Sequence, residues 1–420
     1  MLRRMRPSFT LAALLAILTL PATALAQSSA DLARVERLLK ATPLIDGHND
    51  WPGALALHAG DARWTADLNR LDAKAYDTDI ERLRAGRVGG QFWSVYVSAS
   101  LPELEQVRRT LEQIDLVKRI VQRYPQDFRL ATTAAEVRAA HKAGRIASLM
   151  GAEGGGQIAS DLSILRTYHD LGVGYLTLTH GKTIAWADSA TDAPAHGGLT
   201  AFGKTVVQEM NRLGMLVDLS HVSEGVMRDA IATTRAPVIF SHSSARALCD
   251  HSRNVPDDVL RLVARNGGIV MVNFAPQFVS ESRRLWGGAR AGEEARLNTL
   301  YTGEPARAAS AMATWEKANP EPRATIADVA NHVDHIAEVA GHDHVGLGGD
   351  YDGLAMLPEG MDGVDAYPRL FLELVKRGWS DADLAKLAGR NILRVMEAAE
   401  KVAGEMKTVP PFNAKVEAEK

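Results

Sequence analysis

Residues 216–242 read LVDLSHVSEGVMRDAIATTRAPVIFSH, and this stretch decides the fold. Two short apolar runs, 216–221 and 238–242, enclose an amphipathic segment at 223–234. Apolar runs of this length predict strands, and the segment between them has helical spacing. A strand, a helix and a second strand in this order predict two parallel strands joined by a crossover helix. Both predicted strands end in histidine.

The same unit recurs along the chain. Eight strands are predicted, at 44–50, 90–97, 146–153, 175–180, 216–221, 238–242, 269–274 and 345–350. Helical patterns lie between them, among them 103–124, 200–213, 223–234, 256–266 and 325–340. Near-continuous Val, Ile and Leu strands indicate a parallel sheet covered on both faces. Eight units favour an α/β fold of the closed (β/α)8 TIM barrel type over an open doubly wound sheet.

Two connections are longer than a barrel requires. They are residues 51–88 after the first strand and 275–344 after the seventh, and we interpret both as insertions that shape a substrate pocket. Part of the second, residues 283–323, is rich in Ala and Arg and could equally form an oligomer contact.

Composition excludes several classes of protein. The 420 residues are 24% charged and 46% hydrophobic, as in ordinary folded proteins and unlike disordered or collagen-like chains. The formal net charge of −3 argues against a nucleic-acid partner, whose phosphates call for a basic face. No G-x-G-x-x-G follows the first strand and no phosphate-binding P-loop occurs.

The N-terminus predicts export. Three arginines within the first six residues precede an apolar run at 11–20 and the small-residue pattern Ala24-Leu25-Ala26. We interpret residues 1–26 as a signal peptide and 27–420 as a single barrel domain in the periplasm. A transmembrane anchor is the alternative, but an apolar run of ten is half of the ~20 residues that cross a bilayer. The residue directly after the predicted cleavage position is not a cysteine, and no apolar tail ends the chain, so we expect no membrane anchor in the mature chain.

Seven metal-binding side chains stand at the predicted C-terminal ends of six strands: His48, Asp50, Glu153, His180, His221, His242 and Asp350. In a parallel barrel these ends share one face, so the side chains converge. A purely structural polar cluster is the alternative. We favour a metal site because imidazoles and carboxylates in a barrel mouth lose hydration unless they are paired or bind cations.

Alternation along a strand allows two ions. His48 and Asp50 point to the same side of the first strand and can share one ion. His221 and His242, from neighbouring strands, can hold a second, and Glu153 has two oxygens to bridge the pair. Imidazole and carboxylate ligands suit Zn²⁺, with Mn²⁺, Co²⁺ and Fe²⁺ still open. Two such ions would hold a hydroxide between them and so supply a nucleophile at neutral pH.

Other polar and aromatic residues have ordinary explanations. His332 and His335 stand three apart on a predicted helix, which is typical of one solvated face. Trp51, Trp64, Trp93 and Tyr96 could wall the pocket or lie in the core. The only cysteine, Cys249, excludes an intrachain disulfide and is interpreted as a small buried residue.

Several motifs resemble one known family. They are LIDGHNDWP from Leu44, LRAGRVGGQFWSVY from Leu83, GAEGG from Gly151, LGVGYLTLTH from Leu171, DLSHVSEGVM from Asp218, FSHSSARALCDHSRNVPDDVLRLV from Phe240, HVGLGGDYDG from His344 and RNILRVME from Arg390. With them the chain resembles, over residues 32–400, the membrane (renal) dipeptidases, peptidase family M19, a family of metal-dependent amidohydrolase-like barrels.

The resemblance implies a zinc-dependent dipeptidase with two Zn²⁺ ions per chain. It would hydrolyse free dipeptides, including L-Xaa-D-Xaa, by a hydroxide that bridges the two ions, and would form a homodimer. His48 and Asp50 would bind one zinc, His221 and His242 the other, and Glu153 both.

The resemblance also assigns three residues to the substrate. His180 would contact the scissile carbonyl oxygen, Arg253 would bind the carboxylate of the dipeptide, and Asp350 would bind substrate and transfer the proton. Two alternatives stay open at this point. One is a related metal-dependent amidohydrolase that acts on a cyclic amide, lactone or phosphoester, and the other is a non-catalytic metal or peptide binder.

Overall fold

The structure is a computed structural model that describes residues 22–416, with side chains described from residue 29. The expected signal peptide, residues 1–26, lies outside the described residues except for its last five, which begin helix α1 (Ala22–Ala41). In the part of the chain that the structure describes, no helix combines the length and apolar character that crossing a bilayer requires.

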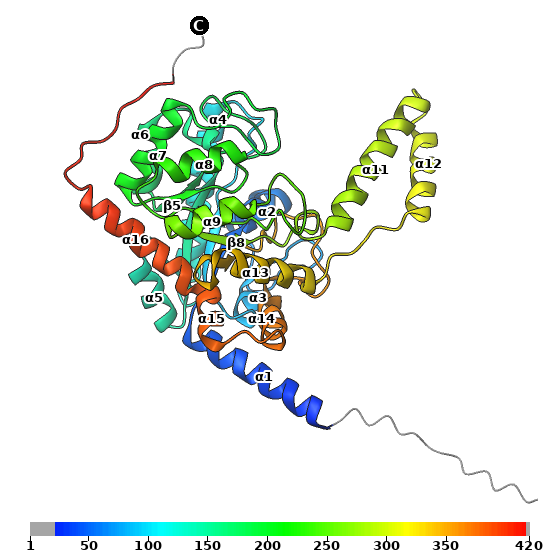
Figure 1. Cartoon of the computed structure of the whole chain (residues 1–420), viewed down its shortest axis with the longest axis horizontal. Helices are drawn as coiled ribbons and strands as arrows, with labels where there is room; N and C mark the ends of the chain where they lie inside the picture. The colour runs from blue at the N-terminus through cyan, green and yellow to red at the C-terminus, as the bar shows by residue number, and fades with distance from the viewer. Residues whose placement is uncertain (1–21, 417–420) are drawn as a thin grey trace, which may run out of the picture.

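Eight parallel strands close into a barrel, which confirms the predicted fold (Figure 1). They are β1 (Leu44–Asn49), β2 (Val88–Ser94), β4 (Ile146–Glu153), β5 (Val173–Thr177), β6 (Leu216–Asp218), β7 (Ile239–Phe240), β8 (Ile269–Val272) and β9 (Val345–Leu347). Pairing of β2 with β4, from Gly90 opposite Ala147 to Ser94 opposite Gly151, closes the ring. Every strand pair is parallel.

A ninth strand, β3 (Phe128–Leu130), was not predicted from the sequence. It pairs with the first residues of β4, from Ile146 to Ser148, on the edge that β5 occupies further along from Met150. Three residues with Arg129 in the middle are too short to show an alternating pattern.

The helices alternate with the strands around the barrel. Those beside the first five strands are α2 (Trp51–His58), η1 (Gly60–Trp64), α3 (Ile80–Ala85), α4 (Glu103–Arg123), α5 (Ala134–Lys142), η2 (Gly155–Ile158) and α6 (Leu162–Asp170). The remaining ones are α7 (Ala201–Leu213), α8 (Glu224–Thr233), α9 (Asp257–Asn266), α10 (Pro276–Val279), α11 (Glu281–Leu300), α12 (Pro305–Ala318), α13 (Ile326–Ala340), η3 (His342–His344), η4 (Val364–Ala366), α14 (Tyr367–Lys376), α15 (Asp381–Ala385), η5 (Lys386–Arg390) and α16 (Asn391–Glu405).

The long connection between β8 and β9 carries a projecting arm. Helices α11 and α12 form a hairpin that extends away from the barrel (Figure 1). The hairpin has a small hydrophobic cluster of its own, formed by Leu297, Ala308 and Met312. The other elements of this connection, α10, α13 and η3, stay at the body, where α13 contacts α9 and η3 contacts β8.

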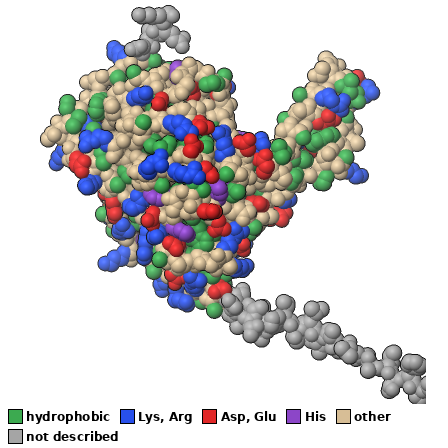
Figure 2. Space-filling view, viewed as in Figure 1, with side chains coloured by type: hydrophobic (Ala, Val, Ile, Leu, Met, Phe, Trp, Pro, Cys, Tyr) green, Lys and Arg blue, Asp and Glu red, His purple; other side chains and the backbone are tan. Residues whose placement is uncertain are grey.

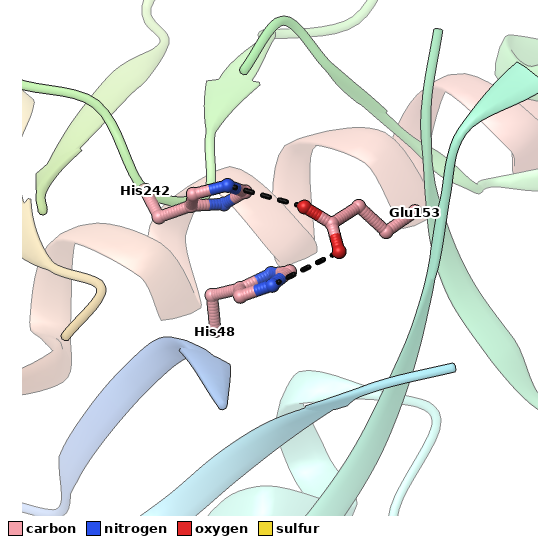
Figure 3. A group of neighbouring side chains, drawn as sticks. All are labelled: His48, Glu153 and His242. Carbon is pink, nitrogen blue, oxygen red and sulfur yellow. Dashed lines mark ion pairs between the residues drawn. The ribbon is translucent and has the colours of Figure 1, made fainter. Parts of the chain in front are cut away.

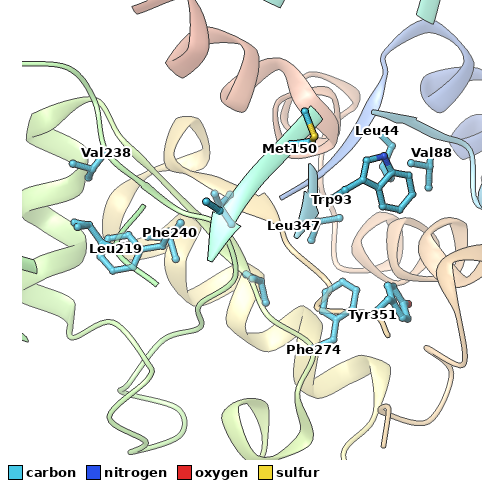
Figure 4. Packing of buried hydrophobic residues seen from close by; sticks show 14 of the residues in the cluster. Leu44, Val88, Trp93, Met150, Leu219, Val238, Phe240, Phe274, Leu347 and Tyr351 are labelled. Atoms are coloured by element: carbon cyan, nitrogen blue, oxygen red, sulfur yellow. The ribbon is translucent and has the colours of Figure 1, made fainter. Parts of the chain in front are cut away.

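Neighbouring residues of one strand belong to two different hydrophobic clusters. Leu44, Phe240 and Val270 lie in the cluster that Figure 4 shows, whereas Ile45, Ile239 and Ile269 lie in a second one. Successive side chains of a strand point to opposite faces, so burial of both faces explains why the strands are apolar throughout.

Several strands end earlier than the sequence predicted. β6 ends at Asp218, β7 at Phe240 and β9 at Leu347, so His221, His242 and Asp350 lie just beyond the regular strands. His221 and Asp350 have φ angles of 66° and 61°, which no strand residue adopts. These three residues therefore stand on the loops that leave the barrel, whereas His48 and Glu153 lie within β1 and β4.

Candidate active site

Glu153 is the residue around which the imidazoles gather (Figure 3). It is the last residue of β4 and is 3% exposed. Its Oε1 lies 2.9 Å from Nε2 of His221 and 3.3 Å from Nε2 of His242. Its Oε2 lies 3.4 Å from Nε2 of His48. Oε1 thus faces the imidazoles of His221 and His242, and Oε2 faces that of His48.

Two further carboxylates, those of Asp50 and Asp350, lie near His48. Nε2 of His48 lies 3.3 Å from Oδ2 of Asp50 and 4.0 Å from Oδ1 of Asp350. On the other side, Nε2 of His180 lies 3.8 Å from Oε1 of Glu153. The structure therefore brings together all seven residues that the strand ends predicted, in overlapping sets whose ligand atoms lie within 4.8 Å of one another.

The ring nitrogens of the cluster are arranged as ligands of cations. Nε2 of His221 and Nε2 of His242 lie 2.9 Å apart, and Nε2 of His48 is buried without a hydrogen-bond partner. Unprotonated ring nitrogens so close together repel each other unless a proton or a cation lies between them. Burial, the largest cause, lowers the pKa of His221 and of His242 well below the usual value, which favours the neutral form that binds metal.

Glu153 keeps its negative charge despite its burial. Burial by itself would raise the pKa of this carboxyl, but the charges of His48 and His180 and the hydrogen bonds from His221 and His242 lower it well below the usual value. A charged carboxylate in this position attracts cations to both sides of the site.

Tyr175 on β5 orients the ring of His48. Its hydroxyl donates to the carbonyl oxygen of Gly47 at 3.2 Å and lies 2.8 Å from Nδ1 of His48. The hydroxyl therefore accepts the Nδ1 proton, and Nε2 is directed to the site. Burial would lower the pKa of His48, but Tyr175, Glu153 and Asp50 raise it well above the usual value, so a cation that binds here displaces a proton from Nε2. A Cβ at Gly151 would lie 1.9 Å from the Tyr175 ring, so this position on β4 requires glycine.

We expect Tyr175→Phe to weaken metal binding about 10- to 100-fold, because the Nδ1 proton loses its acceptor. Competition with a chelator measures the affinity. Tyr168→Phe is the matched control, since the Tyr168 hydroxyl also donates in the interior, to the carbonyl oxygen of Gln157 at 2.7 Å, without contact to the site. Equal losses in both variants would contradict an orienting role.

A second chain of hydrogen bonds orients His242. Its Nδ1 lies 2.8 Å from Oγ of Ser241, and that hydroxyl donates to Oδ2 of Asp218 at 2.6 Å. Asp218 also accepts from the backbone N–H groups of Ser220 and Ser241, so a buried carboxylate joins the ends of β6 and β7. The Nε2 of His242 is thereby directed to Glu153.

A similar buried carboxylate, Asp46, supports the first strand. It accepts from the backbone N–H of His48 at 2.8 Å and from that of Gly349 at 2.7 Å, which joins β1 to the loop after β9. Neither Asp46 nor Asp218 was predicted from the sequence as a site residue. Their position within the apolar runs LIDGH and LVDLS is the feature that could have identified them, because an acidic residue in a buried strand needs partners.

Arg253 is a buried cation with no acidic partner. The residue is 2% exposed, and no carboxylate of the described residues lies within ion-pair distance of it. Its guanidinium donates to Oγ of Ser243 at 3.3 Å and to the carbonyl oxygen of His242 at 3.4 Å, while Nε has no partner. Burial lowers its pKa to about 10, which still leaves it charged at neutral pH. A buried charge of this kind calls for an anionic ligand.

One cavity of about 710 Å³ connects these groups. Its lining includes members of the metal cluster and Arg253, together with apolar side chains at the mouth: Asp50, Glu153, His180, His221, Asp350, Arg253, Leu57, Leu101 and Leu354. His48 and His242 lie behind this lining and are almost fully buried. The size and the mixed lining suit a small organic ligand.

Asp350 lies where the cavity meets the cluster. Its Oδ2 accepts from Nδ2 of Asn273 at 2.8 Å, which leaves Oδ1 directed to His48. Burial, opposed by the charge of His48, raises the pKa of Asp350 to about 8. The left-handed backbone of Asp350 is a strained conformation that persists because the surrounding contacts fix it.

Burial decides between core and surface for several other residues. Trp51 and Trp93 lie in the core and Tyr96 lines the cavity. The solvated face predicted for His332 was wrong: this residue is fully buried, and its Nδ1 accepts from the backbone N–H of Ala245 at 3.0 Å. It thereby holds the loop that carries His242 and Arg253. Cys249 is buried, as expected.

Comparison with known proteins identifies the family. The sequence profile of the membrane dipeptidases (peptidase family M19) matches residues 32–409. A probable dipeptidase, PvdM, from Pseudomonas aeruginosa has a similar structure, with a TM-score of 0.77, 24% identity and coverage of 89% of this chain and 100% of that chain. The dipeptidase AC, a metallo peptidase of family M19, has a TM-score of 0.70 at 26% identity, with coverage of 85% and 98%.

A third similar structure is a metallo peptidase from Rhodobacter sphaeroides liganded with a phosphinate mimic of the dipeptide L-Ala-D-Ala. Its TM-score is 0.70 at 24% identity, with coverage of 85% of this chain and 99% of that chain. The family match spans nearly the whole chain, and the barrel and the metal-binding cluster agree with it. The protein belongs to the membrane dipeptidase family, peptidase family M19, and is a metallodipeptidase.

Proposed function

We propose that this metallodipeptidase uses two Zn²⁺ ions per chain and hydrolyses free dipeptides, including L-Xaa-D-Xaa. His48 and Asp50 would hold one ion, His221 and His242 the other, and Glu153 both. One observation carries the proposal: a single cavity contains both the carboxylate shared by two imidazole groups and a buried arginine without an acidic partner. The phosphinate mimic bound to the Rhodobacter sphaeroides relative supports acceptance of a D-residue.

The protein side chains have distinct tasks in this reaction. When bound, the two ions would supply a nucleophile from water at neutral pH and would polarise the carbonyl group. Arg253 would bind the carboxylate of the dipeptide and so place the peptide bond beside Glu153 and Asp350. His180, at 3.8 Å from Glu153, would donate a hydrogen bond to the carbonyl oxygen as negative charge develops there.

Asp350 would move the proton. Its Oδ1 faces the cluster while Asn273 holds Oδ2, so one oxygen is free to accept a proton from the attacking water and to deliver it to the leaving amine. Asp350 would thus act first as base and then as acid.

Arg253→Ala tests the proposal. We expect KM for L-Ala-D-Ala to rise about 100-fold with a much smaller change in kcat, because truncation leaves the substrate carboxylate without its partner. Initial rates on free and C-terminally amidated dipeptides provide the measurement. The wild type should cleave only the free forms and should contain two zinc ions per chain.

Arg246→Ala is the control for this variant, because Arg246 lies on the same loop but pairs with Glu224 outside the cavity. Wild-type protein that cleaves amidated dipeptides as fast as free ones would contradict the proposed role of Arg253. Cleavage of lactones or phosphoesters in place of dipeptides would favour the related amidohydrolase. The signal peptide, the periplasmic location and the homodimer stay predictions, which N-terminal sequencing of the exported protein and its solution mass would test.

A further inference from the structure

A second cavity lies at the opposite end of the barrel from the active site. Its volume is about 590 Å³, and it lies where β2 and β4 begin, at Val88 and Ile146. Glu153 marks the other end of β4. Its charged and titratable lining is entirely basic: Lys40, Arg84, Arg87, His141, Lys142 and Arg145. We call this site the basic cavity.

Acidic neighbours neutralise only part of this charge. Arg84 pairs with Asp127, and Arg87 pairs with Glu36 at 2.5 Å. Among the described residues, no carboxylate lies within ion-pair distance of Lys40, Lys142 or Arg145. Five Lys and Arg residues minus two carboxylates leave three positive charges around one cavity, in a chain whose formal net charge is −3.

Helix ends account for some of these basic residues. The C-termini of α1, α3 and α5 meet here, and basic side chains in a last helical turn interact favourably with the helix dipole. Each C-terminus contributes roughly −0.5 charge, or about −1.5 for the three. Half of the excess positive charge therefore remains, so capping of helices does not explain the whole cluster.

The wall of the cavity also exposes backbone. Gly144, which follows α5, has a φ angle of 71°, and a Cβ at that position would meet nothing within 4 Å. At Gly89 a Cβ would lie 2.8 Å from Cα of Pro43 and 3.0 Å from Nδ1 of His141, so these two residues pack directly on the backbone at the start of β2. Long basic side chains around a floor of backbone leave room for a compact ligand. At the lower left of the body, over α1 and α5, Figure 2 shows several Lys and Arg side chains.

We propose that the basic cavity binds a multiply charged phosphorylated anion. Lysine and arginine both bind phosphoryl oxygens, and the guanidinium of Arg145 can do so with two parallel hydrogen bonds. About 1.5 positive charges remain after the helix dipoles, so a single carboxylate would leave part of this charge unbalanced, whereas a phosphorylated anion with two or more negative charges balances it. The phosphoryl groups could belong to a free small molecule or to the headgroups of an anionic lipid, and the proposal is independent of the dipeptidase reaction.

Calorimetric titration of the zinc-loaded protein with pyrophosphate at 50 mM salt tests this proposal. We expect one site per chain at the basic cavity, with an affinity that falls at least tenfold between 50 and 200 mM salt because the contacts are ionic. Lys40→Gln/Lys142→Gln/Arg145→Gln should weaken binding at least 30-fold and leave kcat/KM for dipeptides unchanged. Arg261→Gln/Lys317→Gln/Lys407→Gln removes the same numbers of Lys and Arg charges elsewhere and should bind as the wild type does.

The other outcomes are also decisive. If the first triple variant still binds pyrophosphate, the anion binds at the metal centre and the proposal is overturned. Equal weakening in both triple variants would indicate a general charge effect and would also overturn it.

Vesicles of phosphatidylcholine with 30% phosphatidylglycerol distinguish the source of the phosphoryl group. Co-sedimentation that the first triple variant loses, without pyrophosphate binding, would support a lipid phosphoryl group. No binding of either probe, with a lower melting temperature of the first triple variant, would show that the cluster only caps helices.

Discussion

Asp350→Asn should reduce kcat for dipeptide hydrolysis about 10³-fold while the protein still contains two zinc ions per chain. The amide has the shape of the carboxyl group but cannot accept or deliver a proton, and loss of a general acid–base group typically costs 10²- to 10⁴-fold in rate. KM should change only a few-fold, because Arg253 would still bind the substrate carboxylate.

Asparagine is the appropriate replacement for two structural reasons. The φ angle of 61° at Asp350 is left-handed, and asparagine adopts this conformation more readily than other residues with a side chain. In addition, the amide oxygen can still accept the hydrogen bond from Asn273. An alanine at this position would mix backbone strain with the loss of chemistry.

The measurement is the rate at saturating L-Ala-D-Ala together with the zinc content by atomic emission. Asp343→Asn is a suitable control, since Asp343 pairs with Lys386 on the far side of β9, outside the cavity. Retention of more than a tenth of wild-type kcat would refute the proton-transfer role. Loss of zinc from the variant would instead assign Asp350 to metal binding, as its 4.0 Å separation from His48 permits.

The sequence predicted the barrel and its metal-binding cluster because both depend on local pattern. His48 and Glu153 are parts of strands whose apolar runs are plain, and parallel strands place their ends on one face. The convergence of the seven residues therefore followed from strand order alone. The ends of the strands were predicted less well. His221 and Asp350 adopt the left-handed conformation, which no periodic pattern in the sequence reveals.

Arg253 could not be predicted as a cavity residue from the pattern of the chain. It lies on the irregular loop after His242, and long-range contacts set its position. The backbone N–H of Ala245 donates to His332 on α13, and the side chain of Asn254 donates to the carbonyl oxygen of Phe278 at 2.8 Å. Only the family resemblance indicated Arg253 beforehand. Loops of this kind take their shape from partners that are distant in sequence.

The buried polar supports were missed for a related reason. Asp46, Asp218 and Tyr175 act through hydrogen bonds to groups on or just beyond neighbouring strands, so their role depends on register across the sheet. An acidic residue inside an apolar run indicates only that a partner is needed, not which one. The sequence thus identified the residues whose potential ligand atoms converge and left out those that orient them.

Glu153→Gln should reduce zinc affinity at least 100-fold and lower hydrolysis below detection. The glutamine side chain has the same length but lacks the negative charge that faces His48, His221 and His242, and its NH₂ group cannot bind a cation. Because one carboxylate faces both groups of imidazoles, we expect both ions to be weakened together, in contrast to a His48 variant, which should affect one.

A 100-fold weaker affinity corresponds to about 2.7 kcal/mol of lost binding free energy, and a ligand that binds only the folded state stabilises it by a related amount. The melting temperature of the zinc-loaded Glu153→Gln variant should therefore fall toward that of the chelator-treated wild type. Glu338→Gln, which changes an exposed glutamate of α13, should keep wild-type zinc affinity and melting temperature. Two zinc ions bound to Glu153→Gln with undiminished affinity would refute the bridging role. A large difference in melting temperature between the chelator-treated variant and the chelator-treated wild type would show that Glu153 is needed for folding itself. Besides the imidazoles, Oε2 of Glu153 accepts a hydrogen bond from Ser94 at 3.1 Å, which the amide oxygen of glutamine can also accept. We therefore expect the metal-free forms to be similar and the zinc-loaded forms to differ.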